Sequence, residues 1–573
     1  MSAQLLAGEP ESPASSPGTG ATPARRTFRL KLAGACALVS VVLFVAYIRL
    51  SWTAPVNSDG AANVLQAFDI LNGNVLLHGW WLSDVSFYST ELPQYVLIEV
   101  FLGAIPAVIH VAAAMTYTMV IVLAAVLAKG RSTGREAVIR MMLVAGIMLA
   151  PQPGGPPQLG GGVFVLDLSL GHIGTAVPML VTLLLIDRAG TRRWVPATVG
   201  LLLAWALVAD SLVLVIGILP VVTCCVLRLY RTLVIRREPL AAAWFEVFLA
   251  TAAIVAVPVA STVLAVLHAL GGFQLQPANT LIIQGTGLLG HASTTFESVL
   301  VLFGADFFGL PAGLPALCGF VHLAGVLLAG WAVWIGLRRL VRGSGQDYSH
   351  SLVEDLMVVA ILANLAGYLL TMSVRPSYAR DIAVVLPFAA VLAGRLMPAR
   401  LAAMRLFPAL GVILAGYVLT LAVGVVQPAV PTQNSQLAQW LASRHLTYGL
   451  GPYWQANSTT VASHERVQVS PVADITGRMV GTYPWEAVHS WYDPRLHDAN
   501  FLVLDDQDNE YPASLPYVTR GNAVATFGKP AETFRVGHYT ILIWHKNLLT
   551  GLHCTVFDSR QGVPPTAGPA PCG

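Results

Sequence analysis

The sequence predicts an all-α membrane domain of about eleven transmembrane helices, with further helices at the outer membrane surface and a C-terminal extracytoplasmic α/β domain. Three observations lead to this fold class. Of 573 residues, 55% are hydrophobic and only 11% are charged, whereas soluble domains carry about 25% charged residues. Long apolar stretches recur up to residue 426, and ordinary polarity begins at residue 427. A single soluble fold and a disordered chain are therefore excluded, and a net charge of +3 gives no reason to expect nucleic-acid binding.

The membrane domain is predicted over residues 25–426, after a Pro-, Ser- and Gly-rich segment, 1–24, that is predicted to be disordered. A transmembrane helix needs about 20 mostly apolar residues. Several stretches are shorter, so the count is good to about one or two. No convincing cleavage site follows the first stretch, so we interpret it as a retained anchor rather than a signal peptide. The eleven stretches are 30–48, 108–128, 137–150, 173–187, 195–209, 211–227, 244–267, 314–336, 353–371, 381–396 and 407–426.

The basic residues predict the topology. Between residues 25 and 426 there are 24 Lys and Arg, and 21 of them fall at the N-terminus or in alternate loops. Because such loops face the cytoplasm, the N-terminus is predicted inside and the C-terminus outside. The other loops hold only Arg49, Arg375 and Arg380.

The outer loops contain candidate contacts for a lipid or a sugar. Residues 94–107 and 296–308 are amphipathic but too short to span, so helices lying on the outer membrane surface are predicted. Trp80, Trp81 and Tyr88 precede the first of these stretches. They are candidates for stacking on a sugar or a lipid headgroup, and an interfacial aromatic belt is the alternative.

The C-terminal domain, residues 427–573, is predicted to mix helix and strand. A helix is predicted over 434–445 and strands over 459–462, 466–469, 500–504, 522–527 and 538–544, with Gly and Pro between them. Cys554 and Cys572 lie in this extracytoplasmic part, where a disulfide can form. Two free thiols are the alternative.

Short motifs give a resemblance to a known family. Asp59 follows the outer end of the first helix within Asn57-Ser58-Asp59-Gly60, and the next helix is predicted to stop at Leu71-Asn72-Gly73-Asn74. The segment Arg375-Pro376-Ser377-Tyr378-Ala379-Arg380-Asp381 precedes a late helix, and the C-terminal domain begins with Leu437-Ala438-Gln439-Trp440-Leu441. Together these resemble the GT-C superfamily of integral-membrane glycosyltransferases. The likeness is to the bacterial type that uses polyprenyl-phosphate sugars and is similar to dolichyl-phosphate-mannose-protein mannosyltransferases. It covers nearly the whole chain.

The resemblance implies a role for each motif. Asp59 would be the general base that accepts a proton from the acceptor hydroxyl, and capping of its helix is the alternative. Arg375 and Arg380 would bind the donor phosphate, since a guanidinium matches phosphate in a bidentate manner. Ion pairing, for example between Arg380 and Asp381, is the alternative. Tyr378 is a further candidate contact for sugar or lipid.

Further polar residues of the outer loops are candidates for a second acidic position. Asp167, Asp210 and Glu91 are candidates for orienting the acceptor. Asp167 and His172 are weak candidates for ligands of a divalent metal. The alternative is that they are ordinary polar residues of the loop. No cofactor is expected with certainty.

The expected function is transfer of a sugar from a polyprenyl-phosphate donor to a glycan, lipid or protein acceptor of the cell envelope. The resemblance implies a multi-pass protein of a bacterial plasma membrane, with the chemistry outside the cell. A transporter or flippase for a lipid-linked glycan, or a non-catalytic envelope scaffold, are the alternatives. In a transporter we would expect ionisable residues in the middle of helices and internal sequence repeats, and no repeat is visible.

Overall fold

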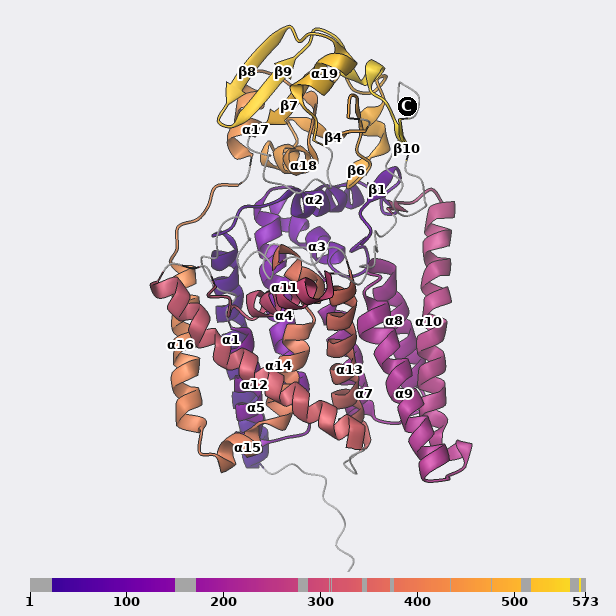
Figure 1. Ribbon diagram of the computed structural model, residues 1–573, viewed down its shortest axis with the longest axis vertical. Helices are drawn as coiled ribbons and strands as arrows, with labels where there is room; N and C mark the ends of the chain where they lie inside the picture. The colour runs from indigo at the N-terminus through magenta and orange to yellow at the C-terminus, as the bar shows by residue number, and fades with distance from the viewer. Residues whose placement is uncertain are drawn as a thin grey trace, which may run out of the picture. The chain divides into compact units, whose positions relative to one another are not determined.

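The computed structural model of the protein describes most of the chain (Figure 1). The described residues are 23–149, 172–276, 287–308, 310, 312–342, 348–371, 376–432, 434–475, 477–506, 517–556 and 566–567. The predicted disordered segment, 1–24, lies almost entirely outside them. The chain divides after Leu43 into two compact units, and the boundary falls within helix α1 (Pro23–Ser51).

The protein is rich in helices and contains candidate membrane spans, as predicted. Within the described ranges, seven helical segments are long and apolar enough to cross a membrane. They correspond to α1 (Pro23–Ser51), α4 (Ala107–Lys129), α9 (Leu219–Tyr230) with its flanking turns, α10 (Trp244–Ala269), α12 (Leu314–Arg342), α13 (Tyr348–Leu370) and α16 (Phe407–Val425). Because these helices are apolar over this length, they indicate a lipid bilayer environment.

The other predicted spans form shorter helices. These are α5 (Gly134–Met148), α7 (Ala176–Ala189), α8 (Val195–Ala209) and α14 (Val385–Leu396), each below the length of about 20 residues that a straight span needs. The count of eleven therefore stays a prediction. Proline in the first turn starts α8, where its missing N–H costs nothing. Gly190, with a φ of 60°, ends α7.

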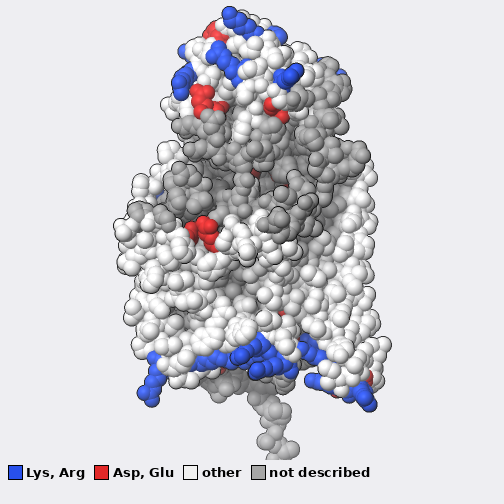
Figure 2. Space-filling model, in the orientation of Figure 1, with Lys and Arg blue, Asp and Glu red and all other residues white. Residues whose placement is uncertain are grey.

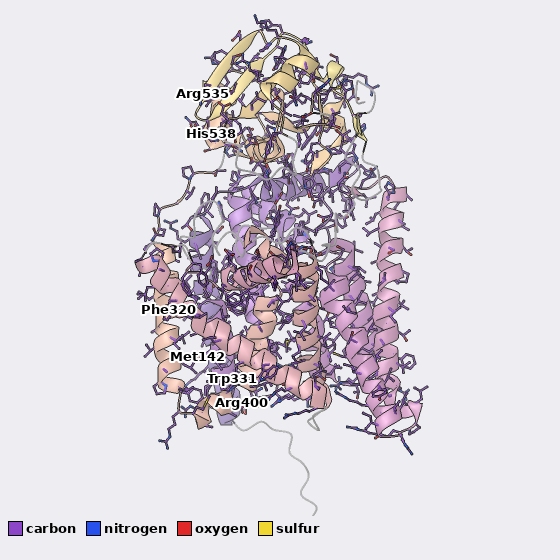
Figure 3. All side chains as sticks on the ribbon, viewed as in Figure 1. Met142, Phe320, Trp331, Arg400, Arg535 and His538 are labelled. Atoms are coloured by element: carbon purple, nitrogen blue, oxygen red, sulfur yellow. The ribbon has the colours of Figure 1, made fainter. Side chains whose placement is uncertain are left out.

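Helix α3 (Leu92–Leu102) overlaps the predicted stretch 94–107, whereas α11 (Leu288–Leu302) shares only residues 296–302 with the predicted stretch 296–308. Helix α3 buries Tyr95 and Glu99 and exposes Val100 and Phe101. Longer helices also expose large apolar side chains, among them Phe320 and Trp331 of α12 and Met142 of α5 (Figure 3). Such side chains suit contact with lipid rather than water.

Basic side chains gather at one end of the helical region, as Figure 2 shows. Helices α4, α7, α12 and α14 all carry Lys or Arg in their last turn. One of these residues is buried: Arg395 binds Asp187 at 2.7 Å and the carbonyl of Leu127 at 2.7 Å. This contact ties α14, α7 and α4 together. The short helix α15 (Pro398–Ala403) follows α14 at the same end (Figure 1).

A small sheet connects three segments that are distant in sequence. Strand β1 (Trp80–Leu82) pairs in parallel with β2 (Gln274–Leu275) and antiparallel with β6 (Ala487–Val488). The two long loops of the helical region are thereby joined to the C-terminal region. Helix α2 (Ser58–Leu71) packs against α18 (Tyr453–Ala462) of that region and adds a second contact.

The C-terminal region contains a six-stranded sheet with the order β5-β4-β3-β7-β9-β8. Strands β3, β4 and β7 are parallel, and the other three are antiparallel to their neighbours. The predicted mixed α/β character is confirmed. The strands are β3 (Tyr448–Gly451), β4 (Gln468–Asp474), β5 (Val480–Thr482), β7 (Phe501–Asp505), β8 (Glu532–Val536) and β9 (Tyr539–Ile543), with helices α17 (Ser435–Ser443) and α19 (Arg520–Phe527). A separate antiparallel pair consists of β10 (Thr555–Val556) and β11 (Thr566–Ala567).

Two predicted strands of this region are wrong. Residues 459–462 belong to helix α18, and residues 522–527 belong to helix α19. In α19 the hydroxyl of Thr519 accepts a hydrogen bond from the backbone N–H of Asn522, a helix cap. In α18 tertiary packing against α2 and β4 overrides the strand preference of Thr and Val.

Candidate functional site

Asp59 lies in the first turn of α2 but does not cap it. The cap is Asn57, whose Oδ1 accepts a hydrogen bond from the backbone N–H of Gly60 at 3.0 Å. The capping alternative for Asp59 is therefore wrong. A carboxylate in the first turn also gains from the helix dipole. Its side chain is left to interact with other segments.

The carboxylate of Asp59 binds two residues from distant parts of the chain. Its Oδ2 lies 3.4 Å from Nη1 of Arg380, and its Oδ1 accepts a hydrogen bond of 2.6 Å from the hydroxyl of Tyr453. Arg380 comes from the helical turns η7 (Pro376–Ile382), and Tyr453 begins helix α18. The site therefore combines the first loop, the segment before α14 and the C-terminal region. The structure thus brings together Asp59 and Arg380, two residues that were predicted to belong to one site.

Arg380 contacts the side chains of Asp59, Tyr378 and Asp381. Its guanidinium carbon lies 5.5 Å from the ring centroid of Tyr378, a cation–π contact. Its Nε lies 4.0 Å from Oδ1 of Asp381. The ion-pairing alternative for Arg380 is thus present in the structure, and it involves Asp59 as well as Asp381. Tyr378 joins the site through this arginine.

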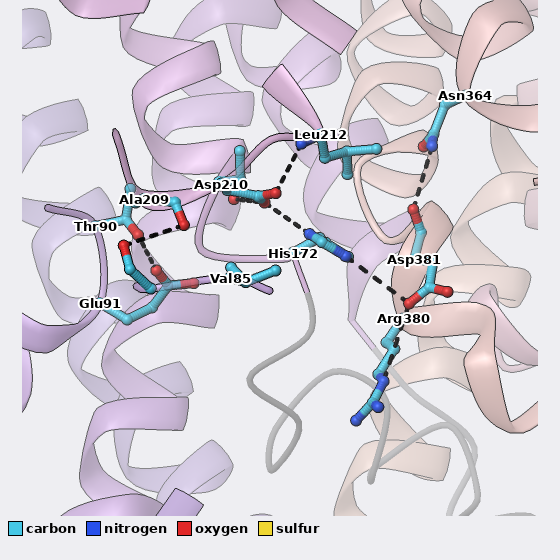
Figure 4. Close-up of polar contacts among 12 residues, drawn as sticks. Val85, Thr90, Glu91, His172, Ala209, Asp210, Leu212, Asn364, Arg380 and Asp381 are labelled. Atoms are coloured by element: carbon cyan, nitrogen blue, oxygen red, sulfur yellow. Dashed lines mark hydrogen bonds and ion pairs between the residues drawn. The ribbon is translucent and has the colours of Figure 1, made fainter. Parts of the chain in front are cut away.

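Asp210 and His172 extend the site (Figure 4). Oδ2 of Asp210 lies 2.7 Å from Nδ1 of His172 and also accepts a hydrogen bond from the hydroxyl of Thr175. Oδ1 of Asp210 accepts from the backbone N–H of Leu212 at 2.8 Å. On the other side of the imidazole, Nε2 lies 3.9 Å from Oδ1 of Asp381. Asp210 is fully buried and held at both oxygens, so it fixes this group of residues.

The charges of this group act on one another. Burial alone lowers the pKa of His172, but the charges of Asp210, Asp381 and Asp84 outweigh burial and raise the pKa to about 9. The pKa of Asp210 is lowered overall. Burial raises it, but the charge and the hydrogen bond of His172 have the larger, opposite effect. The pair is therefore expected to be ionised at neutral pH.

Glu91 is a buried carboxyl at the start of α3. Burial, reinforced by the charge of Asp210, raises its pKa to about 7, although the hydrogen bond from Thr90 opposes this. Gly174 lies so close that a Cβ there would meet the carboxylate oxygen of Glu91 at 1.8 Å. A glycine is needed at that position for steric reasons. Glu91 thus lies against Gly174, whose neighbour Thr175 donates a hydrogen bond to Asp210.

Glu486 is a residue of this region that the sequence did not single out. Its Oε2 accepts a hydrogen bond of 2.6 Å from Nε2 of Gln66, and its Oε1 accepts one of 2.9 Å from the backbone N–H of Ser83. Its own carbonyl accepts from Nδ2 of Asn457 at 2.8 Å. Burial raises the pKa of Glu486 to about 7, with the charge of Asp59 adding to the effect. An acidic residue in an otherwise apolar run, residues 484–488, was the available signal.

Trp80 is buried in the protein and is not exposed at its surface. Its indole Nε1 donates a hydrogen bond of 2.8 Å to Oδ2 of Asp69, and its ring meets Trp491 edge-on at 5.6 Å. Only 1% of Trp80 is exposed, which leaves no surface for stacking on a ligand. Its observed role is to join the first loop to the C-terminal region.

Trp81 and Tyr88 also pack against protein. The ring of Trp81 meets His489 edge-on at 5.1 Å. Tyr88 lies 5.1 Å from the ring of Phe273, and its hydroxyl donates to the carbonyl of Val75 at 2.9 Å. Contact with sugar or lipid stays a prediction for both, since each is partly exposed.

Three predicted residues, Asp167, Arg375 and Cys572, lie outside the described residues. Cys554, the predicted partner of Cys572, is disulfide-bonded. Among the residues that the structure describes, no group of three or more His, Cys, Asp or Glu side chains is arranged to hold a metal ion. His172 makes its contacts with Asp210 and Asp381 instead, and the metal role suggested for it stays untested.

No family model matches this chain, and no curated protein matches it.

Proposed function

We propose that the protein is a GT-C-type membrane glycosyltransferase that moves a sugar from a polyprenyl-phosphate donor to a cell-envelope acceptor. The observation that carries the proposal is the contact of Asp59 with Arg380, 321 residues apart in sequence. A carboxylate beside a guanidinium supplies both groups that the reaction needs. One accepts a proton, and the other offsets charge on the leaving phosphate.

In the proposed reaction the acceptor oxygen forms a bond to the anomeric carbon of the donor sugar. The bond between that carbon and the phosphate oxygen breaks, and polyprenyl phosphate leaves with the electron pair. Asp59 takes the proton of the acceptor hydroxyl. Arg380 binds the phosphate, and its planar guanidinium can donate hydrogen bonds to two of the phosphate oxygens.

The observed pairing suggests how donor and acceptor act in order. In the structure Arg380 engages Asp59, so each group neutralises the other. A donor phosphate would replace Asp59 as the partner of Arg380. The released Oδ2 of Asp59 would then be free to receive the proton. Tyr453 would keep Oδ1 in place, since its hydrogen bond of 2.6 Å does not involve Arg380.

The proposed orientation puts this site on the outer side of a bacterial plasma membrane, with the N-terminus in the cytoplasm. The band of Lys and Arg at the opposite end of the helices supports it, because basic residues favour the cytoplasmic side. Helices α3 and α11 would lie at the outer membrane surface. The C-terminal region would stand outside and contribute to binding of the acceptor. Divalent metal dependence is left to experiment.

The experiment is sugar transfer from a radiolabelled polyprenyl-phosphate donor by protein in nanodiscs, with Asp59→Asn as the test variant. General-base catalysis contributes about 10²- to 10⁴-fold, so a loss of that size is expected. The matched control is Asp69→Asn, which changes a carboxylate on the same helix that binds Trp80. Wild-type transfer by Asp59→Asn would refute the role of the base. Movement of an intact glycolipid without a new glycosidic bond would identify a transporter instead.

A further inference from the structure

His172 lies between two carboxylates, and each ring nitrogen faces one of them. Nδ1 lies 2.7 Å from Asp210, and Nε2 lies 3.9 Å from Asp381 (Figure 4). A neutral imidazole carries one N–H and one bare nitrogen, whereas the charged form donates from both. A bare nitrogen facing either carboxylate would be repelled by it. The arrangement therefore suits the imidazolium form.

Four acidic groups among the described residues interact electrostatically with this ring, and they come from separate segments. Asp210 follows α8, Asp381 lies in η7, Asp84 precedes α3 and Glu91 begins it. The charges of Asp210, Asp381 and Asp84 raise the pKa of His172 to about 9 despite burial, which agrees with the geometry. Without the cation, this many buried or half-buried carboxyl groups would repel one another.

The chain of contacts continues to the proposed donor site. The same oxygen of Asp381 that faces His172 also faces Nε of Arg380, at 3.9 and 4.0 Å respectively. Arg380 then meets Asp59 at 3.4 Å. Asp381 thus lies between two cations, His172 and Arg380. Asp210 in turn fixes the position of His172. The position of Arg380 is linked through Asp381 to the charge of His172.

We infer that His172 is a charged positioning residue, which holds Asp381 and through it directs the Arg380 guanidinium toward Asp59 and an incoming phosphate. The role rests on the proposed function, because the phosphate is that of the proposed donor. His172 itself touches neither substrate nor reacting atom in this scheme. Loss of its proton would weaken the hold on Asp381 and let Arg380 settle closer to that carboxylate.

The charge of His172 is tested on the full-length protein in nanodiscs by nitrogen NMR of labelled histidine. The signal of His172, one of 14 histidines, is identified by its loss in His172→Gln. An imidazolium signal at pH 7.5 that becomes neutral in Asp210→Asn is expected. A neutral imidazole in the wild type at pH 7.5 would overturn the proposal. Asp210→Asn keeps the histidine itself, so the result does not depend on one variant.

The positioning of Arg380 is tested in the same samples with labelled arginine. Its Nε resonance is expected to shift in His172→Gln, and an unchanged resonance would overturn the positioning role. Both NMR measurements are independent of turnover. If they succeed while the wild type transfers no sugar, only the proposed function fails.

With active protein, the pH profile gives a further test. The wild type is expected to lose kcat/KM with an alkaline limb near pH 9. In His172→Gln the limb should vanish and kcat/KM should fall about 10²-fold, the cost of a small misplacement. In His172→Arg, which stays charged, the limb should vanish with most of the activity kept. A wild-type profile in His172→Gln would overturn the role.

Discussion

Replacement of Glu486 by Gln is expected to stabilise the protein at alkaline pH. The residue Glu486 is 6% exposed, and burial, partly opposed by the hydrogen bonds from Ser83, raises the pKa of its carboxyl from an ordinary value of 4.5 to about 7. A change of that size corresponds to about 3 kcal/mol of cost in the charged form. Gln has nearly the same shape and carries no charge.

The sign of the pH dependence follows from proton binding. Between about pH 4.5 and pH 7 the unfolded chain has released the proton of Glu486 while the folded protein keeps it. The unfolded state then binds fewer protons, so stability falls as the pH rises and reaches its full loss above pH 7. Glu486→Gln removes this dependence. The variant is expected to match the wild type near pH 5 and to exceed it by up to about 3 kcal/mol at pH 8.

The hydrogen bonds of Glu486 make the substitution tolerable. A Gln at position 486 can still accept from the backbone N–H of Ser83. Its new amide donors face Gln66, whose Oε1 is buried without a partner and can turn to accept one of them. Glu486→Ala offers neither group. It leaves two buried donors unpaired, at about 1–3 kcal/mol each.

The assay is the Tm of purified protein in detergent, measured at pH 5, 6.5 and 8 for both variants. The control is Glu532→Gln, an exposed carboxyl on β8, which is expected to follow the wild type at each pH. Glu486→Ala should lower the Tm at every pH. If the Tm of Glu486→Gln falls relative to the wild type as the pH rises, Glu486 is a stabilising charge and the reasoning is wrong.

Three further predictions concern single contacts. Tyr453→Phe removes a hydrogen bond that holds the site carboxylate and is worth about 1.5–3 kcal/mol, so kcat/KM should fall by about 10- to 100-fold; a wild-type kcat/KM would contradict this. Arg395→Met leaves Asp187 buried without its nearest cation and should cost about 3–5 kcal/mol, seen as a large drop in Tm; an unchanged Tm would mean that the pair contributes little. Trp80→Phe removes the bond to Asp69 and should cost about 1.5–3 kcal/mol, whereas an unchanged Tm would leave packing as the only role of Trp80.

The sequence predicts local features of this protein well where one physical signal dominates. Long apolar runs identify the candidate spans, and short apolar runs between turn residues identify β7 and β9 at 501–505 and 539–543. Prediction fails in helix α18, where Ser458-Thr459-Thr460-Val461 has the composition of a strand. The segment is helical because it packs between α2 and the sheet, and such long-range contacts leave no mark in local composition.

The candidate site was predicted in part for the same reason. Asp59 could be predicted from the motif that resembles a known superfamily, and Arg380 because Lys and Arg are rare in the loops that were predicted to lie outside. Their contact could only be expected from the resemblance, since 321 residues separate them. The link from His172 through Asp381 depends on the fold of three separate segments. No spacing in the sequence encodes it.

The most direct test of the central claim is a structure of the protein with a bound polyprenyl-phosphate sugar, determined by electron microscopy in nanodiscs. We expect a phosphate oxygen within about 3 Å of the Arg380 guanidinium and Asp59 separated from that guanidinium, with the bond from Tyr453 to Asp59 kept. A phosphate bound elsewhere, or an intact Asp59–Arg380 pair in the presence of the donor, would contradict the account.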